Sequence, residues 1–153
     1  MKLLDFLSYE CVLAELAAHN KEDVLTELAN VVTQAHHSIN KIELVSILKE
    51  REKVGSTGIG NGVAIPHGKY QGISSLVAAF GRSPSGIDFN ALDGHKVHFF
   101  CLLVAPQDSV GDHLKALACI SRLFKKEDFR DKLSRAPSKD EIWSILSAVD
   151  KAT

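Results

Sequence analysis

Apolar residues recur at helical spacing in two segments near the start of the chain. The first segment follows Asn20, a candidate N-cap, and carries Glu22 and Asp23 where its first turn would lie. Its apolar positions are Val24, Leu25, Leu28, Val31, Val32 and Ala35. The second segment begins near Asn40, which forms a capping-box-like pair with Glu43. Its apolar stripe consists of Ile42, Val45 and Leu48. Both segments are predicted to be helices.

Two apolar runs in the middle of the chain have the character of buried strands. They cover residues 76–80 and 97–104, and turn-forming residues bound both of them. A third segment, residues 11–16, is compatible with an edge strand or a short helix, and the strand is the favoured interpretation. Strands that are buried on both faces need helices on both sides of the sheet.

The C-terminal part of the chain is predicted to supply further helices. One covers residues 112–124, with Asp112 as N-cap, and a second covers residues 126–135. The apolar side of the first consists of Leu114, Leu117, Ala118, Ser121 and Phe124. A capping box of Ser138 and Glu141 marks the start of a last helix. The sum predicts an α/β fold, a single layered domain over residues 1–153 with a mixed β-sheet flanked by helices on both faces. The pattern leaves the strand order open.

Charge and cysteine content restrict the partners and the compartment. The chain has 18 Lys and Arg against 19 Asp and Glu, so no net positive field would attract nucleic acid or an anionic membrane. We expect neither partner and no membrane insertion, because no window reaches the apolar length of a membrane span. The three cysteines form no C-x-x-C pair, and the N-terminus lacks the pattern of a secretory signal. A reducing, cytoplasmic location is therefore expected.

The glycine-rich segment of residues 55–72 is too irregular for a helix and is predicted to be a functional loop. It does not match a dinucleotide-binding fingerprint, because Val63 or Ile65 stands where the third glycine would be required. It does not match a Walker A loop either, since Tyr70 stands in place of Ser or Thr. The chain therefore shows no nucleotide-binding motif.

His67 lies between Pro66, which restricts the backbone, and Gly68, which is expected to let the chain turn. An imidazole with a pKa near 6.5 is largely neutral in the cytosol, so one nitrogen keeps a lone pair for nucleophilic attack. These properties suit a reversible phosphoryl acceptor. For an isolated Pro-His-Gly tripeptide, however, a histidine that merely caps a turn is the commoner situation.

The surrounding residues favour the phosphoryl acceptor. An arginine, the run Gly-Ser-Thr-Gly-Ile-Gly-Asn-Gly and then Ala-Ile-Pro-His-Gly-Lys follow one another from Arg51 to Lys69. This segment closely resembles the site of the enzyme IIA components of the bacterial phosphoenolpyruvate-dependent phosphotransferase system, in the fructose and mannitol class. It is most similar to the nitrogen-regulatory enzyme IIA. The resemblance extends along nearly the whole chain and includes Asp112-His113-Leu114.

The resemblance implies roles for individual residues. The phosphorylated histidine of the family falls on His67, its second active-site histidine on His113 and its active-site arginine on Arg51. Ser56, Thr57 and Gly68 fall in the loop that supports the phosphate. A guanidinium suits the equatorial oxygens of a phosphoryl group, and a helix N-terminus near His113 would favour an anion. On the residues alone, a solvated helix-end arginine is the favoured interpretation of Arg51, and His113 could equally be a histidine of a capping turn.

The resemblance also implies a phosphate donor and a reaction. Phosphate would reach Nε2 of His67 from the phosphohistidine of an HPr-like carrier protein, with no metal or other cofactor. The expected role is mainly that of a regulatory protein with unidentified target proteins. The alternative is a fructose- or mannitol-type sugar-uptake subunit that passes phosphate to a IIB component. His36, His37, His95 and His98 have no cysteine or acid cluster at the spacing of zinc ligands.

Overall fold

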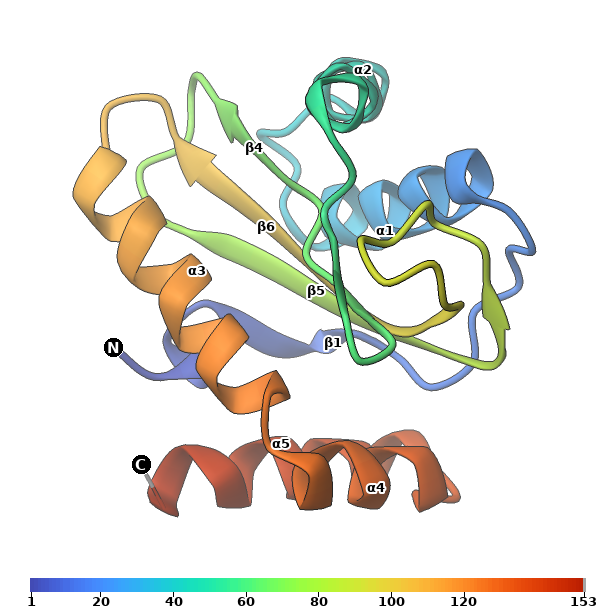
Figure 1. The fold of residues 1–153 in the computed structure, drawn as a ribbon. Helices are drawn as coiled ribbons and strands as arrows, with labels where there is room; N and C mark the ends of the chain where they lie inside the picture. Colours follow the sequence, from blue (N-terminus) through green and yellow to red (C-terminus); the bar gives the residue numbers. More distant parts are fainter. Residues whose placement is uncertain (153) are drawn as a thin grey trace.

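A mixed β-sheet forms the centre of the molecule (Figure 1). The structure is a computed structural model that describes the backbone of residues 1–152 and the side chains of residues 1–150. Within this part the strands are β1 (Leu7–Leu13), β2 (Gly58–Gly60), β3 (Val63–Ala64), β4 (His67–Tyr70), β5 (Val77–Ile87) and β6 (Val97–Pro106). Their order is β1-β5-β6-β3-β2, and β4 also pairs with β6. The β1–β5, β3–β6 and β4–β6 pairs are parallel, whereas β5–β6 and β2–β3 are antiparallel.

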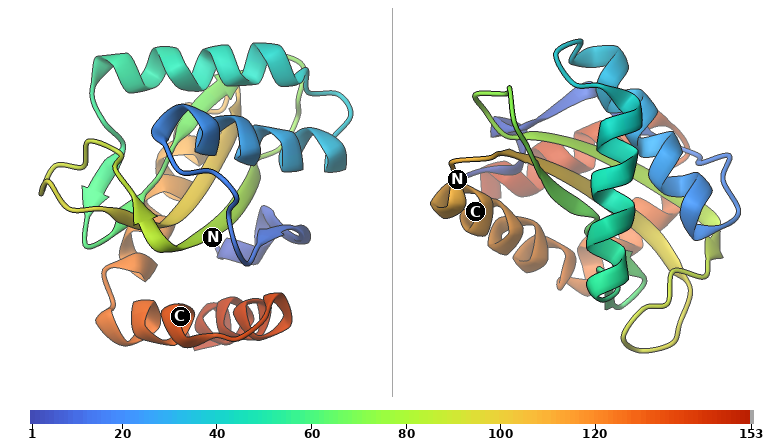
Figure 2. Two further views of the ribbon diagram at one scale, coloured as in Figure 1. Left: turned by 90° about the vertical axis from the view of Figure 1, so that its right-hand side faces the viewer. Right: turned by 90° about the horizontal axis from the view of Figure 1, so that it is seen from above.

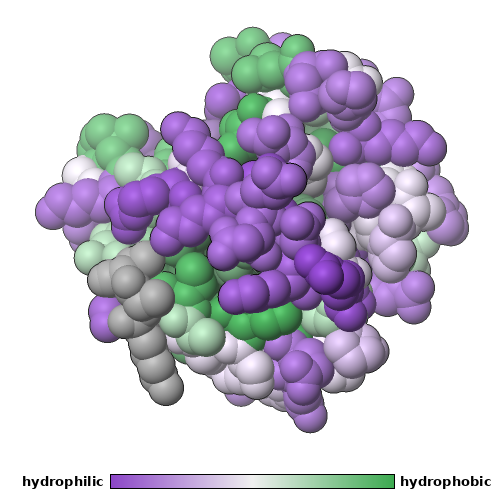
Figure 3. All heavy atoms as spheres, turned by 60° about the horizontal axis from the view of Figure 1, so that its bottom comes forward, coloured by the Kyte–Doolittle hydropathy of each residue, from purple (hydrophilic) through white to green (hydrophobic). Residues whose placement is uncertain are grey.

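Helices cover both faces of this sheet. After a short 3-10 helix, η1 (Leu3–Asp5), they are α1 (Lys21–Ala35), α2 (Lys41–Val54), α3 (Val110–Phe124), α4 (Glu127–Arg135) and α5 (Lys139–Ala152). Figure 2 shows α1 and α2 on one side of the sheet and α3, α4 and α5 on the other. The predicted fold class is therefore confirmed. Hydrophilic side chains cover most of the surface on the side of α4 and α5, around a limited apolar area (Figure 3).

Three helix starts lie where the capping residues predict them. The side chain of Asn20 accepts a hydrogen bond from the backbone N–H of Asp23 at 2.9 Å. Asn40 does the same for Glu43 at 3.0 Å, and the hydroxyl of Ser138 accepts from the N–H of Glu141 at 3.2 Å. These bonds satisfy backbone donors that a helix leaves unpaired at its first turn.

The apolar stripes of α2 and α3 differ from the predicted ones. In α2 the buried residues are Leu44 and Leu48, while Ile42 is 81% exposed. In α3 the buried face includes His113, Ala116 and Ile120, whereas Leu114 is 63% exposed. Helix α3 begins two residues earlier than predicted, with Ser109 at the N-cap position, so Asp112 lies in the first turn. In both helices the predicted apolar stripe is therefore rotated about the helix axis relative to the buried face. The reason is that apolar side chains also occur on the exposed side of each helix.

Strand β6 passes through the middle of the sheet and carries the core. Seven consecutive residues of this strand, Phe99 to Ala105, are at most 4% exposed. The predicted strand at residues 76–80 falls at the start of β5, and the one at residues 97–104 lies within β6. The favoured strand at residues 11–16 is confirmed only for residues 11–13, because β1 starts at Leu7 and ends at Leu13. Phe80 and Phe124 stack with ring centroids 6.1 Å apart, which joins β5 to α3.

The glycine-rich segment is not a simple loop, because β2, β3 and β4 lie within residues 55–72. Gly68 does not form the predicted turn and is instead the second residue of β4. A Cβ atom at Gly68 would lie 2.6 Å from Cγ2 of Ile47, so the missing side chain lets α2 pack directly against β4. Glycine is required here for close packing, which brings the end of α2 next to His67.

Candidate phosphoryl-transfer site

His67 is the first residue of β4 and is half-buried. Its Nδ1 atom lies 2.8 Å from the carbonyl oxygen of Ile65. A carbonyl oxygen can only accept a hydrogen bond, so Nδ1 carries the proton and the lone pair of the ring is on Nε2. The backbone is fixed as well, because the N–H of Leu103 in β6 donates to the carbonyl of Pro66 at 2.9 Å. Strand pairing and the Ile65 bond together set the direction of the ring.

His113 lies next to His67, although it comes from helix α3 on the other face of the sheet. The two ring centroids are 5.4 Å apart, and the ring planes are inclined by 74°. The residue is 8% exposed, and its buried Nε2 atom has no hydrogen-bond partner within the described chain. A buried polar atom without a partner is costly, and such atoms often mark sites that bind a further group.

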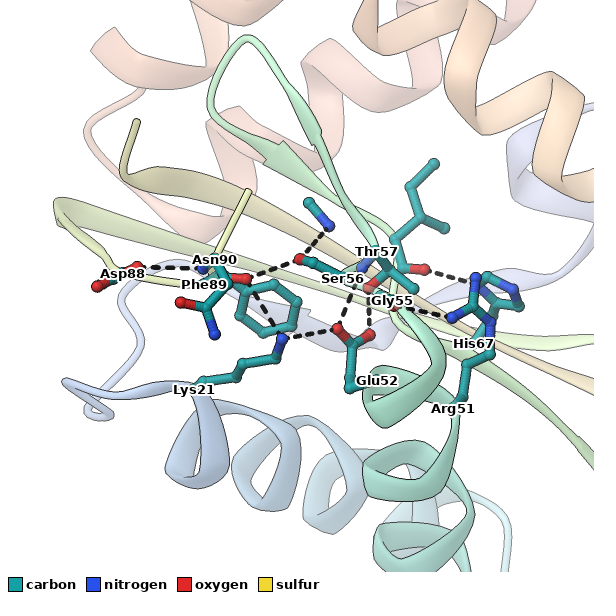
Figure 4. A network of polar contacts seen from close by, with 12 residues as sticks. Lys21, Arg51, Glu52, Gly55, Ser56, Thr57, His67, Asp88, Phe89 and Asn90 are labelled. Carbon is teal, nitrogen blue, oxygen red and sulfur yellow. Dashed lines mark hydrogen bonds and ion pairs between the residues drawn. The ribbon is translucent and has the colours of Figure 1, made fainter. Parts of the chain in front are cut away.

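Arg51 lies in the last turn of α2, and its side chain approaches the ring of His67 (Figure 4). Its Nη1 atom donates to the carbonyl oxygen of Gly55 at 2.9 Å, which holds the side chain against the start of the loop. The structure therefore brings together the three residues that the sequence predicts as the reacting centre. They come from three elements, β4, α2 and α3.

The surroundings lower the pKa of both imidazoles and so favour their neutral forms. Burial lowers the pKa of His67, and the Arg51 charge lowers it further, while the bond to Ile65 and the charge of Glu52 act in the opposite direction. Burial also lowers the pKa of His113, assisted by the charges of His67 and Lys69. His113 lies in the first turn of α3, as expected, but its own N–H is not free for an anion, because it donates to the carbonyl of Ser109 at 2.9 Å. Burial is thus the main cause of the lowered pKa of His113.

Ser56 and Thr57 hold the loop together with their hydroxyl groups. The Ser56 hydroxyl donates to the carbonyl of Phe89 at 2.7 Å and accepts from the N–H of Gly58 at 3.0 Å. The Thr57 hydroxyl donates to the carboxylate of Glu52. Both side chains are therefore engaged in contacts that shape the loop, and Gly68 lies in the packing contact between β4 and α2.

Two charged residues of this network were missed by the sequence analysis. Glu52 binds the backbone N–H of Thr57 at 3.1 Å, and Lys21 forms an ion pair with Glu52 at 3.0 Å (Figure 4). The carboxylate side chain is only 6% exposed. Because Lys21 belongs to α1 and Glu52 to α2, no local spacing in the sequence indicates this pair.

The arrangement is suited to the transfer of an anionic group. Nε2 of His67 is a neutral nucleophile, the guanidinium of Arg51 supplies positive charge, and Nε2 of His113 is a free polar atom. Among the described residues, no group of three or more His, Cys, Asp or Glu side chains is placed to hold a metal ion. In the same part of the chain, no helix is long and apolar enough to cross a membrane.

Comparison with known proteins agrees with this chemistry. The family model described as "Phosphoenolpyruvate-dependent sugar phosphotransferase system, EIIA 2" matches residues 5–149. The chain belongs to this EIIA family. It is therefore a phosphocarrier component of the phosphotransferase system, as the resemblance of residues 51–69 predicts.

Individual relatives of this EIIA chain include both regulatory and sugar-specific proteins. A nitrogen regulatory protein of Bradyrhizobium diazoefficiens is 37% identical over 147 residues, which cover 96% of this chain and 95% of the relative. A fructose-specific EIIABC component of Bacillus subtilis is 33% identical over 99% of this chain, but the match spans 24% of that protein. The crystal structure of the nitrogen regulatory protein IIA-Ntr from Neisseria meningitidis superposes with a TM-score of 0.86 at 30% identity, covering 93% of this chain and 97% of that one.

Proposed function

We propose that this EIIA chain accepts a phosphoryl group on Nε2 of His67 from the phosphohistidine of an HPr-like carrier protein. The observation that carries the proposal is the hydrogen bond from Nδ1 to Ile65, which leaves the lone pair on Nε2. Membership of the EIIA family supports the proposal, because these proteins are components of a phosphotransferase system.

The transfer is an in-line exchange between two nitrogen atoms. The Nε2 lone pair of His67 forms a bond to phosphorus while the P–N bond of the donor breaks, and its electron pair returns to the donor nitrogen. The guanidinium of Arg51 stabilises the negative charge on the equatorial oxygens. The Nε2 atom of His113 donates a hydrogen bond to one of these oxygens, which gives the orphaned atom a partner. Positioning and charge thus provide the catalysis.

The proposed physiological role is mainly regulatory and cytoplasmic, with residues 1–153 acting as a single enzyme IIA domain. Phosphorylation adds about two negative charges at His67, next to His113, which would change the docking of target proteins. The similarity to nitrogen regulatory proteins over nearly the full length of both chains supports this role.

Sugar uptake is the second candidate function. It is supported by the 33% identity to the fructose-specific EIIABC component of Bacillus subtilis. In this case phosphate would pass from His67 to a IIB protein. A transfer assay with purified IIB proteins distinguishes the roles, because rapid transfer to one of them supports sugar uptake and its failure with all supports regulation.

Phosphorylation of His67 can be tested directly. The chain is incubated with phosphoenolpyruvate and the upstream carriers of the system, and the modified residue is located by mass spectrometry under alkaline conditions. We expect one phosphoryl group on His67 and none in His67→Ala, while His36→Ala serves as the matched control and is labelled normally. An unmodified wild-type chain, or a phosphoryl group on another residue, would refute the proposal.

The regulatory role has a separate test. Pull-downs with His67→Ala and His67→Asp compare a neutral residue with a negative charge at the same position. Different partner sets are expected if phosphorylation changes docking, whereas identical sets from both variants contradict a phosphorylation-dependent switch.

A further inference from the structure

We propose that Glu52 is a positioning residue for phosphoryl transfer, which holds the ring of His67 in its reactive orientation through Thr57 and Ile65. The inference rests on the proposed role of His67 as phosphoryl acceptor. It gives a function to the ion pair between Lys21 and Glu52. Within the described structure, neither residue of this pair makes a direct hydrogen bond to Arg51, His67 or His113.

The first step is the attachment of the loop to Glu52. The carboxylate accepts the backbone N–H of Thr57 at 3.1 Å and also accepts the Thr57 hydroxyl. Both bonds are charge-assisted, and the carboxylate side chain is only 6% exposed, so water competes little for them. The backbone at Thr57 is therefore fixed relative to the last turn of α2.

The second step leads from Thr57 to the imidazole. The N–H of Ile65 donates to the carbonyl of Thr57 at 3.0 Å, and the carbonyl of Ile65 accepts the Nδ1 proton of His67 at 2.8 Å. The N–H and the carbonyl of Ile65 belong to two rigid peptide groups joined at its Cα, and the following Pro66 restricts the backbone of Ile65 to extended geometry, so a fixed N–H constrains where the carbonyl points. A shift of Thr57 is thereby passed to the bond that selects the tautomer of His67.

The third step is the anchoring of the carboxylate itself. Lys21 pairs with Glu52 at 3.0 Å, lies over the ring of Phe89 at 4.6 Å from its centroid, and donates to the carbonyl of Phe89 at 3.4 Å. A buried ion pair contributes little net stability in general, because both charges lose their hydration. Its value here is the fixed position that it gives to the Glu52 carboxylate.

The position of Glu52 next to Arg51 adds a geometric link. The two residues are neighbours in the last turn of α2, yet Arg51 approaches the ring of His67 whereas Glu52 binds the loop (Figure 4). One helical turn therefore carries the cation for the phosphoryl oxygens and the anchor for the nucleophile. The last turn of α2 therefore helps to set the distance between the guanidinium of Arg51 and the imidazole of His67.

We call the chain of contacts from Glu52 through Thr57 and Ile65 to His67 the relay. The test compares variants of this relay with a matched control on the same helix. Glu52→Ala removes both bonds to Thr57, and Thr57→Val removes only the hydroxyl bond. Thr57→Ser is the conservative variant that restores the hydroxyl. Glu50→Ala is the control, since within the described residues Glu50 pairs only with the exposed Lys53, at 2.8 Å. For each full-length variant, the tautomer of His67 is read from 15N–1H NMR spectra, and the rate of phosphoryl acceptance from the upstream carrier is measured beside the melting temperature.

We expect the wild-type chain, Thr57→Ser and Glu50→Ala to keep the Nδ1–H tautomer and similar rates. Glu52→Ala should show a mixture of tautomers and accept phosphate roughly tenfold to a hundredfold more slowly, with Thr57→Val in between. The relay is refuted if Glu52→Ala keeps the wild-type tautomer, or if its rate falls only by the fraction of unfolded protein.

Two further outcomes distinguish a failure of the Glu52 relay from a failure of the proposed phosphorylation of His67. If Glu52→Ala does not fold, Thr57→Val decides, because a wild-type tautomer and rate in that variant would overturn the relay. If the wild-type chain accepts no phosphate, the proposed function fails, while the tautomer spectra still show whether Glu52 orients the ring.

Discussion

The rings of His67 and His113 meet edge to face, with their centroids 5.4 Å apart, between the amino end of β4 and the first turn of α3. His67 has its Nδ1 proton engaged with Ile65, whereas Nε2 of His113 has no partner within the described residues. One ring is thus prepared as a nucleophile and the other as a hydrogen-bond donor. Each can be tested separately.

Replacement of His113 should slow phosphoryl transfer without preventing it. His113→Ala removes the proposed donor to a phosphoryl oxygen, and we expect a loss of roughly tenfold to a hundredfold in the transfer rate. His113→Gln, which can place an N–H near the position of Nε2, should retain more of the rate than His113→Ala. Rapid-quench kinetics with the phosphorylated carrier measures both. Equal rates for the wild-type chain and His113→Ala would exclude this role.

Replacement of Arg51 should change both the titration of His67 and the transfer rate. Arg51→Gln removes a charge that lowers the pKa of His67, so this pKa should rise. Transfer should slow by roughly a hundredfold, because the equatorial oxygens lose their cation. Arg51→Lys keeps the charge but not the planar fork, and is expected to keep a pKa near that of the wild-type chain with an intermediate rate. An unchanged pKa of His67 in Arg51→Gln would contradict the observed arrangement.

The protonation of His67 gives a prediction for pH dependence. Burial lowers the pKa of His67 below its ordinary value of 6.5, so the folded chain takes up this proton at lower pH than the unfolded chain. The free energy of unfolding should therefore decrease as pH falls from 6.5 towards the folded pKa. Well above pH 6.5 the ring is neutral in both states, and its titration no longer changes the stability. An NMR titration of His67 gives the folded pKa. Urea unfolding curves of the wild-type chain and His67→Gln, measured across this pH range, then isolate the part of the pH dependence that is due to His67. A folded-state pKa of His67 above 6.5 would contradict the prediction.

The contact of Gly68 with Ile47 predicts a steric effect on stability. Gly68→Ala places a Cβ atom 2.6 Å from Cγ2 of Ile47 and should destabilise the fold by about 1–3 kcal/mol, as overpacking does. In an Ile47→Ala background the same substitution should cost much less. Gly111→Ala is the control, since nothing lies within 4 Å of its added Cβ. Urea unfolding measures all four variants, and an equal cost of Gly68→Ala in both backgrounds would contradict the packing explanation.

The sequence predicted those parts of the fold that depend on local patterns. The caps at Asn20, Asn40 and Ser138 lie where predicted, because capping needs only residues a few positions apart. The strand at residues 97–104 could also be predicted locally, since an apolar run broken only by His98 indicates burial on both faces. The motif around His67 and its resemblance to enzyme IIA identified the three residues that the structure brings together.

Features that depend on packing could not be predicted in this way. Gly68 was expected to form a turn, but its role is set by Ile47 on a different element. The exposed side of α3 carries Leu114, so the apolar pattern alone indicated the wrong face. The pair of Lys21 and Glu52 joins two helices, and a sequence without its fold gives no sign that these charges meet.

The site of phosphate attachment on the ring of His67 tests the central claim most directly. The phosphorylated protein, labelled with 15N at histidine, is examined by two-dimensional 15N–1H NMR, which distinguishes the two ring nitrogens. The Nδ1 bond to Ile65 predicts a phosphoryl group on Nε2, with the proton still on Nδ1. A phosphoryl group on Nδ1 would contradict the account.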